Sequence, residues 1–151
     1  MLPIITRNIC TVFGLGNFTK MPGTLGSIAG VFLGFFFLYF FPIQLVIVFF
    51  IFLLVLSLYA IKIYQKQVGK SDKSEIIIDE VLGQLLVLMF IELEFLQFFC
   101  AFILFRFFDI LKPFPVSYFD KNYKNYFGII MDDIMAGLYS MILIYLISLK
   151  F

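Results

Sequence analysis

Five acidic side chains lie inside or at the edge of apolar stretches of this sequence. They fall in three clusters along the chain: Asp79 with Glu80, Asp109 alone, and Asp132 with Asp133. A carboxylate in apolar surroundings is strongly destabilising unless it pairs with a cation, binds a metal or lines a hydrated cavity. The chain has ten acidic residues in all, so half of them occupy such positions. These acids are therefore the first candidates for a functional site.

Carboxylates must do most of the metal and proton chemistry here, because the sequence contains no histidine. Its absence excludes His-based phosphatases, Ser-His-Asp triads and His-ligated zinc. Clustered carboxylate oxygens suit a hard cation, most naturally Mg²⁺, which also bridges protein carboxylates to phosphate oxygens. The acidic clusters therefore predict a cation site at a membrane surface.

Groups able to bind phosphate accompany the acids. Arg106 and Lys112 flank Asp109, and the helix start PGTLGS offers the hydroxyls of Thr24 and Ser27 together with backbone N–H groups. Acids and bases around a metal indicate phosphoryl chemistry, in which the metal neutralises charge and activates water. A site of this kind at membrane depth indicates a lipid phosphate as substrate.

Composition places the chain among membrane proteins. Of its 151 residues, 63% are apolar and 14% are charged, and the mean hydropathy is +1.08. This length predicts a single domain over 1–151. A net charge of +1 without a basic stripe predicts no nucleic-acid partner, and two cysteines give no disulfide framework. The sequence leaves the oligomeric state open.

Apolar runs predict an all-α fold, a polytopic membrane bundle of about five embedded helices. Each run is near the minimum spanning length of about 17 residues, and they cover approximately 24–40, 43–61, 75–91, 95–111 and 129–149. The positive-inside rule orients them, because the basic residues fall in the segments before the first, third and fifth runs. We therefore expect a cytoplasmic N-terminus, with the tips at 41–42 and 92–94 outside. The basic residues used here are Arg7, Lys20, Lys62, Lys66, Lys70, Lys73, Lys112, Lys121 and Lys124.

This topology brings the five acids to a similar depth on the cytoplasmic face. The first acidic pair opens the third run, Asp109 ends the fourth, and the second pair opens the fifth. The same face is expected to hold Asn17, Thr24, Ser27, Asp72 and Lys112. The acids of distant segments are thus predicted to converge before any contact is assumed.

Simpler explanations exist for some of these residues. Arg106 and Asp109 are spaced i, i+3 and could only neutralise each other. A single acid near a helix start also complements the helix dipole, although this explains poorly why two consecutive acids occur twice. Asp72, Glu75 and Asp120 lie in polar loops, where we expect solvated charges.

A small divalent-cation transporter in the membrane is the alternative function. Transporters place charged groups near the bilayer midplane and often break helices there. Here the acids gather at one end of the predicted helices, and the outer halves carry no charge that would form a path. The distribution of the acids along the helices therefore favours an enzyme that acts on a lipid phosphate over a transporter.

Four sequence blocks, in this order, resemble the phosphatidylglycerophosphatase A family: GLGNFTKMPGTLGS, DKSEIIIDEVLGQ, FRFFDILKPFPV and GIIMDDIMAGLYS. They span approximately 14 to 140. The resemblance implies an all-helical, Mg²⁺-dependent phosphatase in the bacterial inner membrane, with its active site facing the cytoplasm. It would hydrolyse the phospholipid phosphatidylglycerophosphate to phosphatidylglycerol and phosphate. The loop after Pro115 departs from the family in having few glycines, with only Gly128 before the acidic pair.

Residue by residue, the resemblance falls on the acids and bases described above. It implies that the catalytic residues are Asp79, Glu80, Asp109, Asp132 and Asp133. It implies that the Mg²⁺ ligands are Asp79, Glu80, Asp132 and Asp133. The groups implied for the substrate phosphate are Thr24, Ser27, Arg106 and Lys112.

Overall fold

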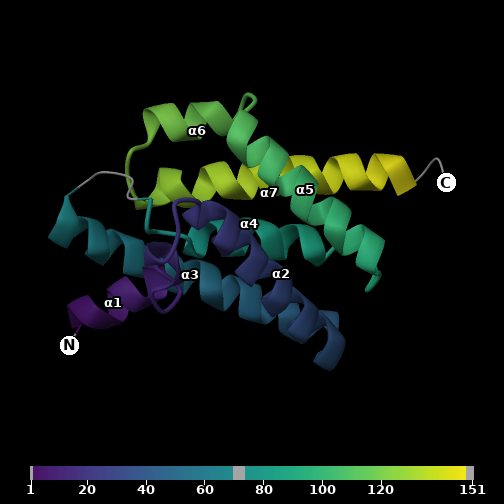
Figure 1. Cartoon of the computed structure of the whole chain (residues 1–151), viewed down its shortest axis with the longest axis horizontal. Coiled ribbons are helices and arrows are strands. Elements are labelled where there is room, and N and C mark those ends of the chain that lie inside the picture. The colour runs from purple at the N-terminus through teal and green to yellow at the C-terminus, as the bar shows by residue number, and fades with distance from the viewer. Residues whose placement is uncertain (1, 70–73, 149–151) are drawn as a thin grey trace.

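The computed structural model describes residues 2–69 and 74–148, and within these ranges the chain is all-α (Figure 1). Lys70, Asp72 and Lys73, which were used for the predicted topology, lie outside the described residues. The described elements are α1 (Leu2–Cys10), η1 (Leu15–Asn17), α2 (Pro22–Phe40), α3 (Ile43–Val68), α4 (Ile78–Leu88), α5 (Phe95–Leu111), α6 (Val116–Asn122) and α7 (Tyr126–Ser148). The predicted fold class is confirmed.

Three of the described helices, α2, α3 and α7, are long and apolar enough to cross a membrane. The chain breaks between α2 and α3 at Phe41-Pro42, as predicted, and α5 has 17 residues. The run predicted over 75–91 forms a helix only over Ile78–Leu88. Eleven residues extend about 16 Å, roughly half the hydrocarbon thickness of a bilayer. The number of spans therefore stays a prediction.

The short helix α4 is the centre of the bundle. It contacts α2, α3, α5 and α7 (Figure 1), and nine of its eleven residues are buried. Its apolar composition thus reflects burial within the protein, which a hydropathy pattern cannot distinguish from burial in lipid. This explains why the sequence predicted a longer, membrane-exposed segment here.

Glycines allow α2 and α7 to approach α4 closely. A Cβ atom added at Gly30 of α2 would lie 2.8 Å from the Cβ of Gln84 in α4. A Cβ added at Gly137 of α7 would lie 2.8 Å from the carbonyl oxygen of Gly83. Small residues at such contacts are typical of helix packing in membranes. The close packing sets the distance between the acids of α4 and those of α7.

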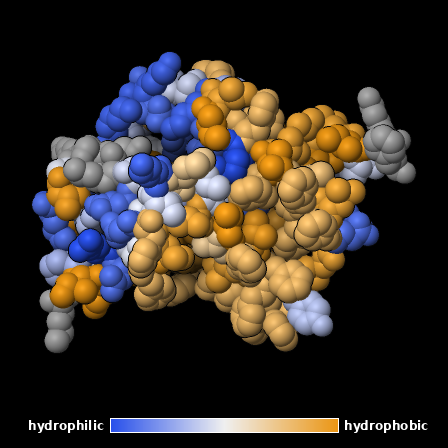
Figure 2. Space-filling view, in the orientation of Figure 1, coloured by the Kyte–Doolittle hydropathy of each residue, from blue (hydrophilic) through white to orange (hydrophobic). Residues whose placement is uncertain are grey.

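The surface divides into a polar end and an apolar end. Hydrophilic residues gather over α6 and the end of α3, whereas the parts of α2, α5 and α7 farthest from them are hydrophobic (Figure 2). Large apolar side chains are widely exposed there, including Phe32 at 71% and Phe95 at 88%. Exposed apolar area of this extent is typical of a surface that contacts lipid. The structure is thus that of a membrane protein.

Candidate active site

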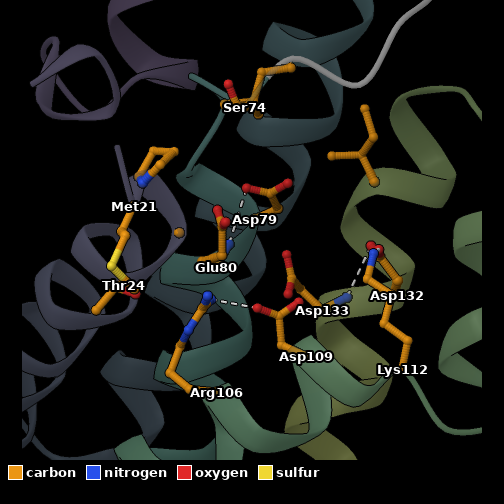
Figure 3. A pocket seen from close by; sticks show the side chains of 14 residues that line it. Met21, Thr24, Ser74, Asp79, Glu80, Arg106, Asp109, Lys112, Asp132 and Asp133 are labelled. Carbon is orange, nitrogen blue, oxygen red and sulfur yellow. Dashed lines mark hydrogen bonds and ion pairs between the residues drawn. The ribbon is translucent and has the colours of Figure 1, made fainter. Parts of the chain in front are cut away.

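The three predicted acidic clusters meet in one pocket of about 310 Å³ (Figure 3). The first turn of α4, the last turn of α5 and the second turn of α7 provide one cluster each. The acids that line the pocket are Asp79, Glu80, Asp109, Asp132 and Asp133. The predicted convergence of the five acids is therefore confirmed. Thr24, Arg106 and Lys112 line the same pocket, again as expected.

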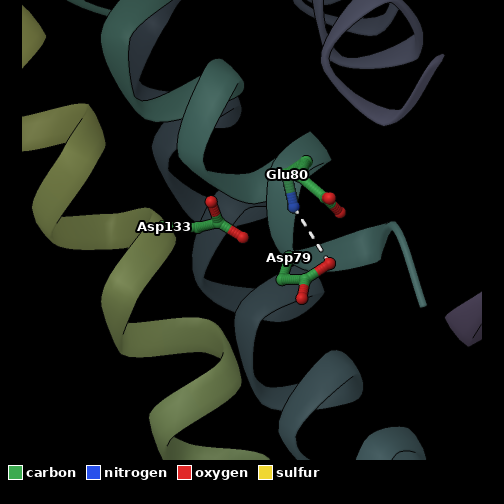
Figure 4. Close-up of side chains that lie close together, drawn as sticks. All are labelled: Asp79, Glu80 and Asp133. Carbon is green, nitrogen blue, oxygen red and sulfur yellow. Dashed lines mark hydrogen bonds between the residues drawn. The ribbon is translucent and has the colours of Figure 1, made fainter. Parts of the chain in front are cut away.

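Asp79, Glu80 and Asp133 form a group of three carboxylates (Figure 4). Each contributes an oxygen that lies within 4.8 Å of the other two. Asp79 is 6% exposed and Asp133 is 4% exposed. One buried oxygen of Glu80, Oε2, and one of Asp133, Oδ1, have no hydrogen-bond partner among the described residues.

Three carboxylates at this spacing, two of them buried, repel one another strongly unless a positive charge lies among them. Oxygen ligands without protein partners are what Mg²⁺ requires, since it binds one or two carboxylates together with waters and phosphate oxygens. The donor set of Asp79, Glu80 and Asp133 therefore fits a divalent cation.

Asp132 lies differently from Asp133, its neighbour in the sequence. Its Oδ2 accepts a hydrogen bond of 2.9 Å from Lys112 Nζ, and it is not part of the group of three carboxylates (Figure 3). Successive residues of a helix point about 100° apart, so the two acids face different neighbours. The role of Asp132 as a metal ligand stays a prediction.

Arg106 forms an ion pair with Asp109 one turn later on α5 (Figure 3). Its Nη1 also lies 3.5 Å from the Oγ of Ser27, and its buried Nε has no hydrogen-bond partner among the described residues. Ser27 itself is fully buried, is not among the residues lining the pocket, and donates its hydroxyl to the carbonyl of Gly23 at 3.0 Å. The structure thus places Ser27 beside Arg106 rather than on the pocket wall.

The start of α2 completes the wall opposite α7. Pro22, Gly23 and Thr24 line the pocket, and α2 begins without a side-chain cap. A Cβ at Gly23 would lie 2.5 Å from Glu80 Oε1 and 3.0 Å from Arg106 Nη1, so any larger residue there would require these two side chains to shift. The first N–H groups of a helix have no partner within the helix and favour anions.

Lys112 binds two acids, Asp132 and Asp120. The expectation that Asp120 is a solvated charge was wrong. The Nζ of Lys112 donates to Asp132 and, at 2.6 Å, to Asp120 of α6. Burial disfavours the charged ammonium, but the hydrogen bond to Asp120 and the attraction of Asp132 outweigh burial and raise the pKa of Lys112 above its usual range. Lys112 is therefore firmly cationic.

Asp120 is not a freely solvated charge, because α6, which follows the turn after α5, brings Asp120 to Lys112. Glu75, also expected to be solvated, accepts a hydrogen bond from the hydroxyl of Tyr64. No local sequence pattern predicts the pair of Lys112 with Asp120 or the pair of Tyr64 with Glu75. Each contact joins residues of different helices or turns, eight and eleven positions apart.

Comparisons with known proteins agree with the resemblance seen in the sequence. A profile of the family described as Phosphatidylglycerophosphatase A matches residues 8–148. The chain is 39% identical over 137 residues to Phosphatidylglycerophosphatase A of Haemophilus influenzae, covering 90% of this chain and 84% of that protein. It is 34% identical over 138 residues to Phosphatidylglycerophosphatase A of Escherichia coli, covering 90% and 79%.

A shorter part of the chain is similar to a protein that carries the name of another lipid phosphatase. The chain is 39% identical over 77 residues to a "Putative phosphatidylinositol-3-phosphatase" of Bacteroides thetaiotaomicron, covering 49% of this chain and 48% of that protein. No solved structure matches the chain.

Proposed function

Since the chain belongs to the phosphatidylglycerophosphatase A family, we propose that the pocket between α4, α5 and α7 is where it hydrolyses phosphatidylglycerophosphate. The protein is a phosphatidylglycerophosphatase of phospholipid biosynthesis, which converts this lipid and water to phosphatidylglycerol and phosphate. The alternative of a cation transporter is set aside, because the matched family and both full-length relatives are phosphatases by name. The convergence of acids and bases from distant helices in one pocket supports this location of the active site.

We assign Asp79, Glu80 and Asp133 as the residues that would hold Mg²⁺. The mutual proximity of the three acids, the burial of Asp79 and Asp133, and the unpartnered oxygens of Glu80 and Asp133 support this assignment. When bound, Mg²⁺ would offset the negative charge that the phosphate develops during transfer. Asp132 is proposed as a further catalytic acid whose carboxylate also positions Lys112.

Arg106, Lys112 and Thr24 are proposed to bind the substrate phosphate. Both cations line the pocket beside the carboxylates, and Thr24 lies at the uncapped start of α2. A guanidinium can bind two phosphate oxygens at once, whereas an ammonium acts as a point charge. Asp109 orients Arg106 through their ion pair, and Ser27 contacts the same guanidinium. These residues would therefore fix the phosphate next to the carboxylate group.

The active site is proposed to face the cytoplasm from a bacterial inner membrane. The pocket opens at the end of the bundle that carries the exposed residues Lys62, Lys66, Lys121 and Lys124. Basic segments remain in the cytoplasm when helices insert. A cytoplasmic N-terminus follows from the same argument.

The test is phosphate release by the purified protein from phosphatidylglycerophosphate in detergent micelles, with and without Mg²⁺. We expect stoichiometric phosphate and phosphatidylglycerol only when the cation is present. Absence of release from this lipid under all cation conditions, in a protein shown to be folded, would contradict the proposed function.

A further inference from the structure

A second cavity lies on the two helices that carry Arg106 and Thr24. It is a groove of about 450 Å³ between α2 and α5, and all of its lining residues are apolar. Ile28, Val31 and Phe35 line it from α2, and Phe98, Phe99 and Phe102 line it from α5. The side chains of Phe35 and Phe98 meet edge to face across the groove, with ring centroids 6.1 Å apart. With no polar lining residue, the groove suits hydrocarbon rather than a polar ligand.

The groove continues from the active-site pocket along both helices. On α2, Thr24 lines the pocket and Ile28, four residues later, lines the groove. On α5, Phe102 lines the groove and Arg106, four residues later, lines the pocket. Residues spaced i, i+4 lie on the same face of a helix, about 6 Å apart along its axis. The same faces of α2 and α5 therefore form both cavities.

The groove runs from the polar end of the molecule toward its apolar end. From the pocket at the polar end it follows α2 and α5 into the hydrophobic region of the molecule (Figure 2). Ile28 to Phe35 span seven positions, so the groove extends about 10 Å along α2. Phe99 is 54% exposed and Phe35 is 49% exposed, so the chain itself leaves the groove open.

We propose that this groove binds an acyl chain of the lipid substrate while the phosphate lies beside Arg106, an inference that rests on the proposed function. The phosphate and the acyl chains belong to one molecule, so a phosphate bound in the pocket delivers hydrocarbon close to its apolar end. An acyl chain in the groove would pack against the phenylalanine rings of α5, and the many van der Waals contacts that it makes there together favour binding. The groove thereby selects a long-chain lipid phosphate over a soluble phosphate ester.

The test compares two forms of phosphatidylglycerophosphate, one with two oleoyl chains and one with both acyl chains removed, in the same detergent solution. Ile28→Trp fills the end of the groove nearest the pocket. Ile51→Trp is the matched control, because Ile51 is a 53% exposed residue of α3 that does not line the groove. Thermal unfolding of each variant in detergent verifies that it is folded.

We expect Ile28→Trp to lower kcat/KM for the long-chain lipid by at least about threefold through KM, since losing about five carbon–carbon contacts weakens binding by roughly that factor. Turnover of the deacylated form, and turnover of the long-chain lipid by the Ile51→Trp protein, should stay within about twofold of wild type, since the deacylated form has no chain to enter the groove and Ile51 does not line it. Phe99→Trp, which adds a smaller obstruction at an exposed position, should shift the same ratio in the same direction and serves if Ile28→Trp does not fold.

An equal loss on both forms, no loss on either, or the same loss in Ile51→Trp would overturn the inference. The last result would mean that lipid contacts anywhere on the bundle matter equally. A change in oligomeric state caused by Ile28→Trp alone, with an unchanged ratio of the two forms, would assign the groove to a second copy instead. A wild-type protein inactive on both forms would contradict the proposed function itself.

Discussion

Lys112 Nζ lies 2.9 Å from Asp132 Oδ2, and this ion pair joins the end of α5 to the second turn of α7. It draws Asp132 toward the α6 side of the pocket, where Lys112 also binds Asp120. Asp133, the next residue, points instead toward Asp79 and Glu80 (Figure 4). Two adjacent acids therefore have different partners, and their variants should behave differently.

The first prediction separates these two acids. Asp133→Asn removes a charge from the group of three carboxylates, so turnover should fall at least about a hundredfold, the upper range for disturbed metal sites. The Mg²⁺ concentration for half-maximal activity should rise as well. Asp132→Asn should instead raise KM with a smaller change in the Mg²⁺ requirement, because it releases Lys112. Steady-state kinetics across Mg²⁺ concentrations measures both.

Glu94→Gln is the control for this pair, because Glu94 is exposed at the start of α5 and far along the helix from the pocket. It should keep near-normal rates. Equal shifts of the Mg²⁺ requirement in Asp132→Asn and Asp133→Asn would show that Asp132 is also a ligand, as the sequence analysis expected.

The second prediction concerns metal removal. Excess chelator should abolish turnover, and readdition of Mg²⁺ should restore it. Because a ligand that binds only the folded state stabilises it, saturating Mg²⁺ should also raise the unfolding temperature in detergent. Asp79→Asn should lose most of this thermal shift, since it removes one of the three carboxylates. Full activity after exhaustive dialysis against chelator would exclude a required cation.

The third prediction distinguishes two roles of Arg106. Arg106→Lys keeps the charge but loses the planar fork that can hold two phosphate oxygens. If Arg106 binds the phosphate, kcat/KM should fall by an amount equivalent to roughly 1–3 kcal/mol of transition-state stabilisation, the value of a charge-assisted hydrogen bond. The Mg²⁺ dependence should change little.

If Arg106 only neutralises Asp109, the double change at both positions should be less damaging than the sum of the two single changes. A kcat/KM equal to that of the wild type, or a loss that excess Mg²⁺ fully rescues, would remove Arg106 from the substrate site.

The fourth prediction tests the close packing of α2 on α4. Gly30→Val introduces a Cβ within 2.8 Å of Gln84 Cβ, so the helices must separate. Overpacking of this kind destabilises by about 1–3 kcal/mol. Phe40→Val, at a 63% exposed site near the end of the same helix, should have little effect. Thermal unfolding in one detergent compares the two, and equal stability of both variants would show that the contact is not tight in the native protein.

The fifth prediction concerns sidedness. In a protein lacking Cys10 and Cys100, single cysteines replacing Lys124 and Glu94 should react with a membrane-impermeant reagent from opposite sides of the membrane. Lys124 is exposed near the pocket end and Glu94 is exposed at the opposite end of α5. Labelling of both from one side would contradict the proposed orientation and, with it, the cytoplasmic active site.

The all-α class and the expectation that the acids lie at a similar depth both follow from the sequence pattern. Depth follows from the order of apolar runs and from the side on which basic residues lie, because a helix places its first and last turns at opposite ends. The acids of α4, α5 and α7 could therefore be predicted to meet. The extent of α4 could not, because burial in protein and burial in lipid select the same apolar residues.

The tertiary structure alone decided which acids face one another. Successive side chains of a helix point about 100° apart, so the neighbours that Asp132 and Asp133 face depend on how α7 is rotated about its own axis. That rotation depends on contacts such as Gly83 against Gly137, made by residues far apart in the chain. The pairing of Lys112 with Asp120 depends likewise on the path of the turn into α6. Local sequence therefore predicts the depth of each acid, whereas the partner of each acid depends on how the helices pack.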